Sequence, residues 1–133
     1  INFDYSRKDY SSMEFRTIDG YEDTHFSDLN WAIYNNLTVA NSYKIGAEIR
    51  SNAMSYRAGY RIDGSPYADT DQYSDRTGFS LGIGYKFNSS TIDLSFEKYN
   101  KQFNHQLYDA GLTNQASIDN NNTIIKLSIT SIM

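Results

Sequence analysis

The sequence predicts an all-β chain, folded as an antiparallel up-and-down sheet of about six strands. Residues 79–87 alternate large apolar side chains with Ser, Gly and Lys over their whole length, which is the period of a strand and not of a helix. The composition agrees, because 15% of the residues are aromatic and there is one Pro. Residues typical of turns separate the alternating runs.

Runs with this period predict strands at about 1–16, 37–50, 53–63, 77–88, 91–105 and 121–133. Most exceed the 5–6 residues or so that are usual in globular proteins and suit the 9–11 or so that cross a bilayer obliquely. Short turns at Ser51-Asn52 and 88–90 alternate with long connections at 17–36, 64–75 and 106–120. Bacterial outer-membrane barrels alternate their connections in this way. We therefore expect a transmembrane β-barrel segment in the bacterial outer membrane, with its C-terminus at the periplasmic rim.

Each expected strand has one apolar face and one charged face. Arg or Lys on a lipid-facing position costs about 2–4 kcal/mol at mid-membrane, so the charged face is expected to line the lumen. It forms either the wall of a polar passage or a network of cross-strand ion pairs, and the second interpretation is favoured for any single residue. The candidates are Lys44, Glu48, Arg50, Arg57, Arg61, Lys86, Asp93, Glu97 and Lys126.

Aromatic residues are expected to follow the apolar faces, many of them near strand ends, as rings anchored at a membrane interface do. A soluble β-sandwich, which would place such rings at mid-strand in a core, is the alternative. The residues are Tyr43, Tyr56, Tyr60, Phe79, Tyr85, Phe87, Phe96 and Tyr99.

Residues 26–37 depart from the strand period. Phe26, Leu29 and Ile33 recur at helical spacing, with Ser27 or Asp28 available as a cap, which predicts a short amphipathic helix. An irregular loop anchored by Trp31 is an equal alternative.

Enzymatic activity, cofactors and nucleic-acid binding find no support. The chain has no Cys, its two histidines are isolated in expected loops, and its net charge of −4 includes no basic block. Asp69, Asp71 and Asp75 are oxygen ligands of the kind that calcium takes. Their spacing differs from an EF-hand loop and Pro66 precedes them, so a solvated loop is the favoured interpretation.

Several short motifs carry a family resemblance. They are the segment 4–15, Gly46-Ala47-Glu48, Arg57-Ala58-Gly59-Tyr60, Gly64-Ser65-Pro66-Tyr67 and Leu81-Gly82-Ile83-Gly84-Tyr85. In this order, over most of the chain, they resemble the C-terminal barrel region of FadL-type outer-membrane transporters of long-chain fatty acids and hydrocarbons, in the form found in Bacteroidetes.

The resemblance implies a monomeric barrel, plugged by an N-terminal hatch, that passes hydrophobic molecules inward. The sequence holds no hatch, and the smallest barrels have about eight strands. We therefore expect residues 1–133 to be the C-terminal portion of a longer barrel, or to be completed by a partner chain. Met133 stands where such barrels commonly end in an aromatic residue. The expected partners are outer-membrane lipid and a hydrophobic small molecule. A structural or secretion-linked barrel without transport and a secreted β-sandwich binding module are the alternatives.

Overall fold

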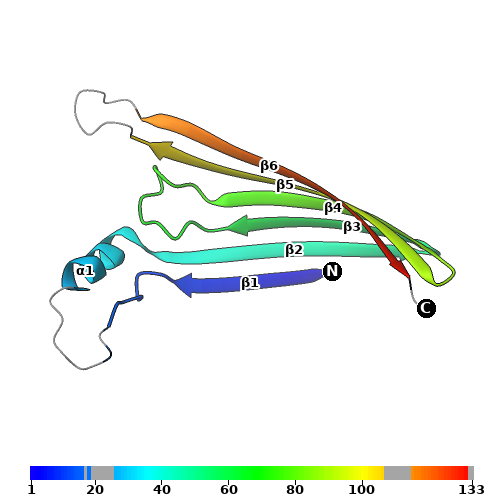
Figure 1. Ribbon diagram of the computed structural model, residues 1–133, viewed down its shortest axis with the longest axis horizontal. Helices are drawn as coiled ribbons and strands as arrows, with labels where there is room; N and C mark the ends of the chain where they lie inside the picture. Colours follow the sequence, from blue (N-terminus) through cyan, green and yellow to red (C-terminus); the bar gives the residue numbers. More distant parts are fainter. Residues whose placement is uncertain (17, 19–25, 107–114, 132–133) are drawn as a thin grey trace.

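A computed structural model describes residues 1–16, 18, 26–106 and 115–131. They form one antiparallel sheet of six strands in the order β1-β2-β3-β4-β5-β6. Figure 1 shows the long connections at one end of the sheet and the short turns at the other, with the N-terminus part-way along the sheet. The all-β, up-and-down fold expected from the sequence is confirmed. The strands are β1 (Asn2–Asp9), β2 (Val39–Ser51), β3 (Met54–Asp63), β4 (Arg76–Phe87), β5 (Ser90–His105) and β6 (Ala116–Ser131).

Strand β1 is shorter than expected, because it ends at Asp9 and not near residue 16. The Asp9 carboxylate accepts a hydrogen bond from Ser11 Oγ at 2.7 Å, and the Asp9 carbonyl oxygen accepts one from Ser12 Oγ at 3.1 Å. The backbone N–H of Met13 donates to the carbonyl oxygen of Tyr10 at 3.3 Å. Asp and Ser side chains commonly form turns in this way, and here they end the strand.

Strand β6 begins at Ala116, ahead of the expected start near residue 121. Its first half is polar and has no period-2 pattern of apolar residues, so alternation alone does not reveal it. Pairing with β5 forms it instead: the register continues as far as Ala116 opposite His105. Within this stretch, Asn100 Nδ2 donates to Asn121 Oδ1 at 2.8 Å.

The two tight hairpins expected from the sequence are confirmed. Strand pairing leaves residues 52–53 and 88–89 as the turns, so the first turn is displaced by one residue from its expected place. Each turn begins with an Asn in the left-handed region, Asn52 at φ 52° and Asn88 at φ 50°. Asn visits this region more readily than most residues.

The connection from β1 to β2 contains helix α1 (Ser27–Asn36), which confirms the helical interpretation of this segment. The cap position is Phe26, and no side chain caps the helix, so the expected cap from Ser27 or Asp28 is wrong. Trp31 is 70% exposed and anchors no irregular loop. Among the described residues, no helix is long and apolar enough to cross a membrane.

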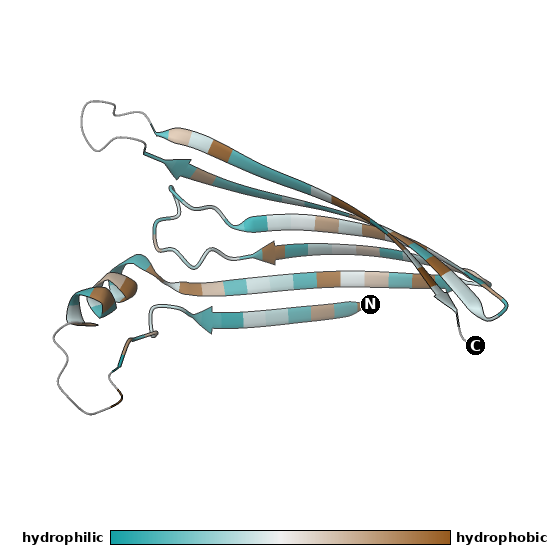
Figure 2. Ribbon diagram, in the orientation of Figure 1, coloured by the Kyte–Doolittle hydropathy of each residue, from teal (hydrophilic) through white to brown (hydrophobic). Residues whose placement is uncertain are grey.

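The sheet is a single layer, and within the described ranges it has no hydrophobic core. Ala40 is the only buried hydrophobic residue there, whereas Ile45, Leu81 and Leu127 are 54%, 53% and 67% exposed. Figure 2 shows apolar and polar residues alternating along the strands, and a long hydrophilic stretch in the first half of β6. Burial of apolar surface is the main force that stabilises a fold. A sheet of this kind therefore needs an apolar environment on one face.

Candidate functional site

Strand register assigns every side chain of the sheet to one of two faces. Residues paired across neighbouring strands point to the same face, and the pairing carries one apolar face unbroken from β1 to β6. This apolar face confirms the expected alternation in each strand. Its large residues include Phe3, Tyr5, Tyr43, Ile45, Ile49, Met54, Tyr56, Tyr60, Ile62, Phe79, Leu81, Ile83, Tyr85, Phe87, Ile92, Leu94, Phe96, Ile125, Leu127 and Ile129.

The apolar residues form a band that crosses the strands obliquely. At the loop end, one row of paired residues is apolar on β1, β2 and β3 but polar on the remaining strands. The row runs from Tyr5 through Tyr43, Ile62, Thr77 and Asn100 to Asn121.

At the turn end the order is reversed. The row there is polar on β2 and apolar on every later strand, and it runs from Ser51 through Met54, Tyr85 and Ile92 to Ile129. Both limits of the band therefore move toward the turn end from β1 to β6. A flat apolar layer crossed by inclined strands produces this outline.

The opposite face, called here the charged face, holds all nine charged residues predicted as candidates. Glu48 accepts from Arg50 Nη2 at 2.8 Å and from Arg57 Nε at 2.9 Å, and Arg57 Nη1 donates to Asp93 at 2.7 Å. Lys126 Nζ lies 3.6 Å from Glu97. Most of the candidates are therefore joined by ion pairs between strands.

Small residues on β4 allow side chains of β3 and β5 to make contact above this strand. Between Arg76 and Lys86, its residues on the charged face are Gly78, Ser80, Gly82 and Gly84. Because these residues are small, side chains of β3 and β5 contact each other above β4. Arg57 forms an ion pair with Asp93, and the guanidinium of Arg61 lies 5.5 Å from the centre of the Tyr99 ring.

A second cluster lies at the loop end of the charged face, and the sequence predicted only part of it. Asp63 binds Arg61 Nη2 at 2.6 Å and Arg76 Nη2 at 2.9 Å. Tyr99 donates to Glu97 at 2.5 Å, with Arg76 5.3 Å from its ring centre. The placement of Tyr99 on the apolar face was wrong, because it lies an odd number of residues from Phe96. Asp63 and Arg76 were not among the candidates. Asp63 lies two residues after Arg61 on the same strand, so alternation alone would have placed it on the charged face.

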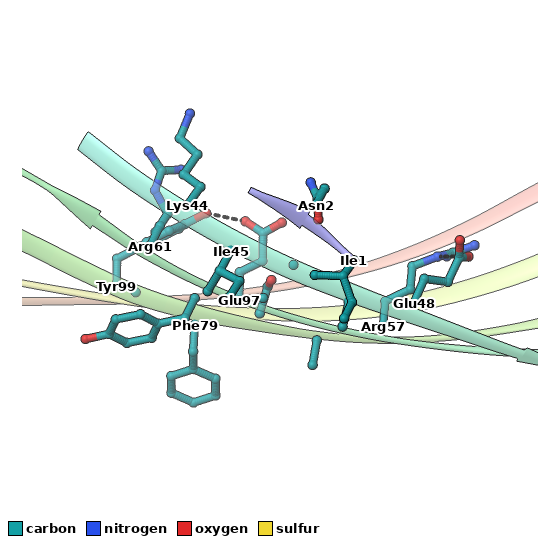
Figure 3. A pocket seen from close by; sticks show the side chains of 17 residues that line it. Ile1, Asn2, Lys44, Ile45, Glu48, Arg57, Arg61, Phe79, Glu97 and Tyr99 are labelled. Carbon is teal, nitrogen blue, oxygen red and sulfur yellow. Dashed lines mark hydrogen bonds and ion pairs between the residues drawn. The ribbon is translucent and has the colours of Figure 1, made fainter. Parts of the chain in front are cut away.

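A hollow of about 580 Å³ lies over the charged face of β2, β3 and β4. Gly46 and Gly59 are among its lining residues, with Lys44 and Arg61 on the loop side and Glu48 on the turn side. Figure 3 shows the charged side chains on one side of the strands and Phe79 on the other. Lys44 Nζ also lies 3.8 Å from Asp4. The hollow therefore has both signs of charge at its walls, beside apolar lining residues such as Ile45 and Tyr60.

Two of the three aspartates at 69, 71 and 75 use their carboxylates to accept from backbone N–H groups. Asp69 Oδ1 accepts from the N–H groups of Asp71 at 3.1 Å and Gln72 at 3.0 Å, and Asp75 Oδ1 accepts from Ser65 N–H at 2.8 Å. In the part of the chain that the structure describes, no three His, Cys, Asp or Glu residues are placed to hold a metal ion. The calcium interpretation is not supported there.

The remaining sequence candidates are less informative. His105 is the exposed last residue of β5, so its expected place in a loop was wrong by one residue. His25 and Met133 lie outside the described residues.

No protein-family model, curated protein or solved structure matches this chain. Its function is therefore inferred from its own residues and their geometry.

Proposed function

We propose that the chain is part of the wall of an outer-membrane β-barrel that transports hydrophobic compounds, such as long-chain fatty acids, across the bacterial outer membrane. The observation that carries the proposal is the oblique band of exposed apolar residues behind an ion-paired charged face.

The apolar residues of the band and its oblique outline both suit contact with lipid. Barrel strands in the outer membrane are tilted by about 35–45°, with an apolar band outside and polar residues inside. On β4 the apolar face is continuous from Phe79 to Phe87. A charged side chain in the band would cost about 2–4 kcal/mol at mid-membrane. The charged residues Arg7 and Lys98 share this face, but each lies beyond the loop-end limit of the band on its own strand.

A soluble sandwich is the weaker alternative. It needs a second sheet over Leu81 and Phe96, and the described part of the chain forms one sheet only.

The barrel requires strands beyond these six. Among the described residues, β1 pairs only with β2, and β6 pairs only with β5. Backbone N–H and C=O groups in lipid must all be hydrogen-bonded, so an open edge cannot stand in a bilayer. Further strands of the same polypeptide, or a partner chain, complete the barrel in this proposal.

Transport is the narrower part of the proposal. It is supported by the resemblance of the motifs given above to FadL-type transporters and by the hollow over β2, β3 and β4, whose lining is partly charged and partly apolar. Such a protein performs no covalent chemistry, and the shape and polarity of its path select the compound. A barrel without transport is the second candidate, favoured by the ion pairs that already satisfy Glu48 and Asp93.

Uptake into vesicles tests the transport proposal. Protein reconstituted in phospholipid vesicles should carry a long-chain fatty acid to an internal fatty-acid sensor faster than protein-free vesicles do. Arg57→Gln and Arg61→Gln, which alter the hollow, should change the rate, whereas Lys8→Gln at the end of β1 should not. A rate equal to that of protein-free vesicles would refute transport and leave the barrel without it.

A further inference from the structure

The turn end of the charged face carries more cations than its carboxylates neutralise. Arg50, Arg57 and Lys86 line a second hollow of about 340 Å³. Ser55, Gly84 and Thr91 also line it.

Register places the three cations around Ser55. Arg50 is paired with Ser55 on the neighbouring strand β2, and Arg57 follows Ser55 by two residues on β3. On the other side Ser55 is paired with Gly84, and Lys86 follows Gly84 by two residues on β4. Lys86 therefore lies diagonally opposite Ser55 on the same face. Gly84 has no side chain, and the Ser55 hydroxyl and the Asp93 carboxylate occupy the space above it, at the side of the hollow.

The carboxylates nearby are already engaged. Glu48 accepts from Arg50 and Arg57, and Asp93 accepts from Arg57. For Lys86 the described part of the chain contains no ion-pair partner. One positive charge is therefore left without a carboxylate.

The two arginines also keep donors for a ligand. A guanidinium has five N–H donors, of which the structure uses one on Arg50 and two on Arg57. One carboxylate, Glu48, accepts from both guanidinium groups and so holds them near each other.

We propose that this hollow binds a phosphate group. A phosphate presents three or four oxygens in a tetrahedron and can accept from Arg50, Arg57 and Lys86 together, with the Ser55 hydroxyl as a further donor. A carboxylate has two oxygens in one plane and a single charge, so it matches three cations arranged around it less well than a phosphate does. The site depends only on the charged face, so it is separate from the question of whether the apolar face contacts lipid.

Two sources supply this chemistry: free inorganic phosphate and a phosphorylated lipid headgroup. Glycerol 3-phosphate represents the headgroup without its chains. If glycerol 3-phosphate binds more tightly than inorganic phosphate, the site is one for a lipid headgroup. If inorganic phosphate binds more tightly, the site is one for the free anion.

Titration of the protein in a phosphate-free, uncharged detergent provides the test, with ³¹P line width and thermal unfolding as readouts. Inorganic phosphate should bind saturably and raise the Tm. Lys86→Gln and Arg50→Gln should each weaken binding about tenfold, since a hydrogen bond to a charged group is lost. Lys86→Arg should retain phosphate binding. The matched control Lys44→Gln, whose residue lines the other hollow, should retain it as well.

Folding of each variant is verified by its circular dichroism. A binding curve without saturation, equal binding by Lys86→Gln and Lys44→Gln, or equal competition by acetate at the same ionic strength would each overturn the phosphate site. The apolar band could still face lipid in all of these cases.

Discussion

Arg57 and Asp93 form an ion pair across an intervening strand. Arg57 Nη1 lies 2.7 Å from Asp93 Oδ1, although β4 separates β3 from β5. Neighbouring strands are about 4.7–4.9 Å apart, so the two side chains together span two such spacings. They do so because β4 has glycine at positions 82 and 84, which leaves the path over that strand open. Through Glu48, the same arginine also reaches β2.

Replacing Gly84 with Ala should disturb this contact. A Cβ at residue 84 would overlap Ser55 Oγ and Asp93 Oδ1, so Asp93 would have to move. We expect a loss of about 1–3 kcal/mol in the free energy of unfolding, as for other overpacked sites. Gly82→Ala is the matched control, because its nearest neighbour, Arg57 Cβ, is 3.4 Å away. Urea unfolding in detergent gives both values, and equal stability of the two variants would contradict the crowding at residue 84.

The contact over β4 should also appear as an energetic coupling. A double-mutant cycle of Arg57→Gln and Asp93→Asn is expected to give about 0.2–1 kcal/mol, the range for pairs that remain partly exposed. The cycle of Lys126→Gln and Asp93→Asn, whose residues form no ion pair with each other, is expected to give a value near zero. A coupling that is no larger for the first pair would show that Arg57 contributes nothing through Asp93.

A charge on the apolar face should cost far more than the same charge on the other face. Ile83→Arg, at the middle of the band on β4, is expected to lower the free energy of unfolding in lipid or detergent by about 2–4 kcal/mol. Ser80 faces the hollow beside Glu97, and Ser80→Arg should change the free energy of unfolding by about 0.5 kcal/mol or less. Comparable losses from both would mean that the face containing Ile83 is not in contact with an apolar phase.

The β4–β5 turn should depend on the left-handed conformation of Asn88. Its φ of 50° disfavours side chains with a Cβ, and Ala lacks the short polar group that lets Asn compensate. Asn88→Ala should lose about 1 kcal/mol of stability, whereas Asn88→Gly should lose nothing, since glycine adopts this φ freely. Thermal unfolding of the two variants side by side measures the difference, and the reverse order would show that the turn adopts another φ.

Period-2 alternation predicted the strand faces well, because each side chain's direction follows from its own strand. It placed the nine charged candidates on one face, as the structure has them. It failed where no alternation exists: the polar first half of β6 forms by pairing with β5, a partner that the local sequence does not contain. The placement of Tyr99 failed because aromatic character was given more weight than the parity of its position.

Contacts between distant strands were beyond prediction from one strand at a time. To predict the ion pair of Arg57 with Asp93, one must know the register of β3, β4 and β5 and the glycines of β4. The slope of the apolar band also appears only when rows of paired residues are compared, since each strand alone shows nothing more than where its own apolar run ends.

Spin labels at Tyr43 and Asn100 test the central claim most directly. Both residues lie in the same register row and on the same face, and the chain has no native Cys, so single-Cys variants are labelled specifically. In lipid vesicles, the account predicts that a label at 43 is accessible to oxygen and shielded from a water-soluble nickel reagent, and that a label at 100 shows the opposite. Equal accessibility of both labels to the nickel reagent would contradict an oblique band in contact with lipid.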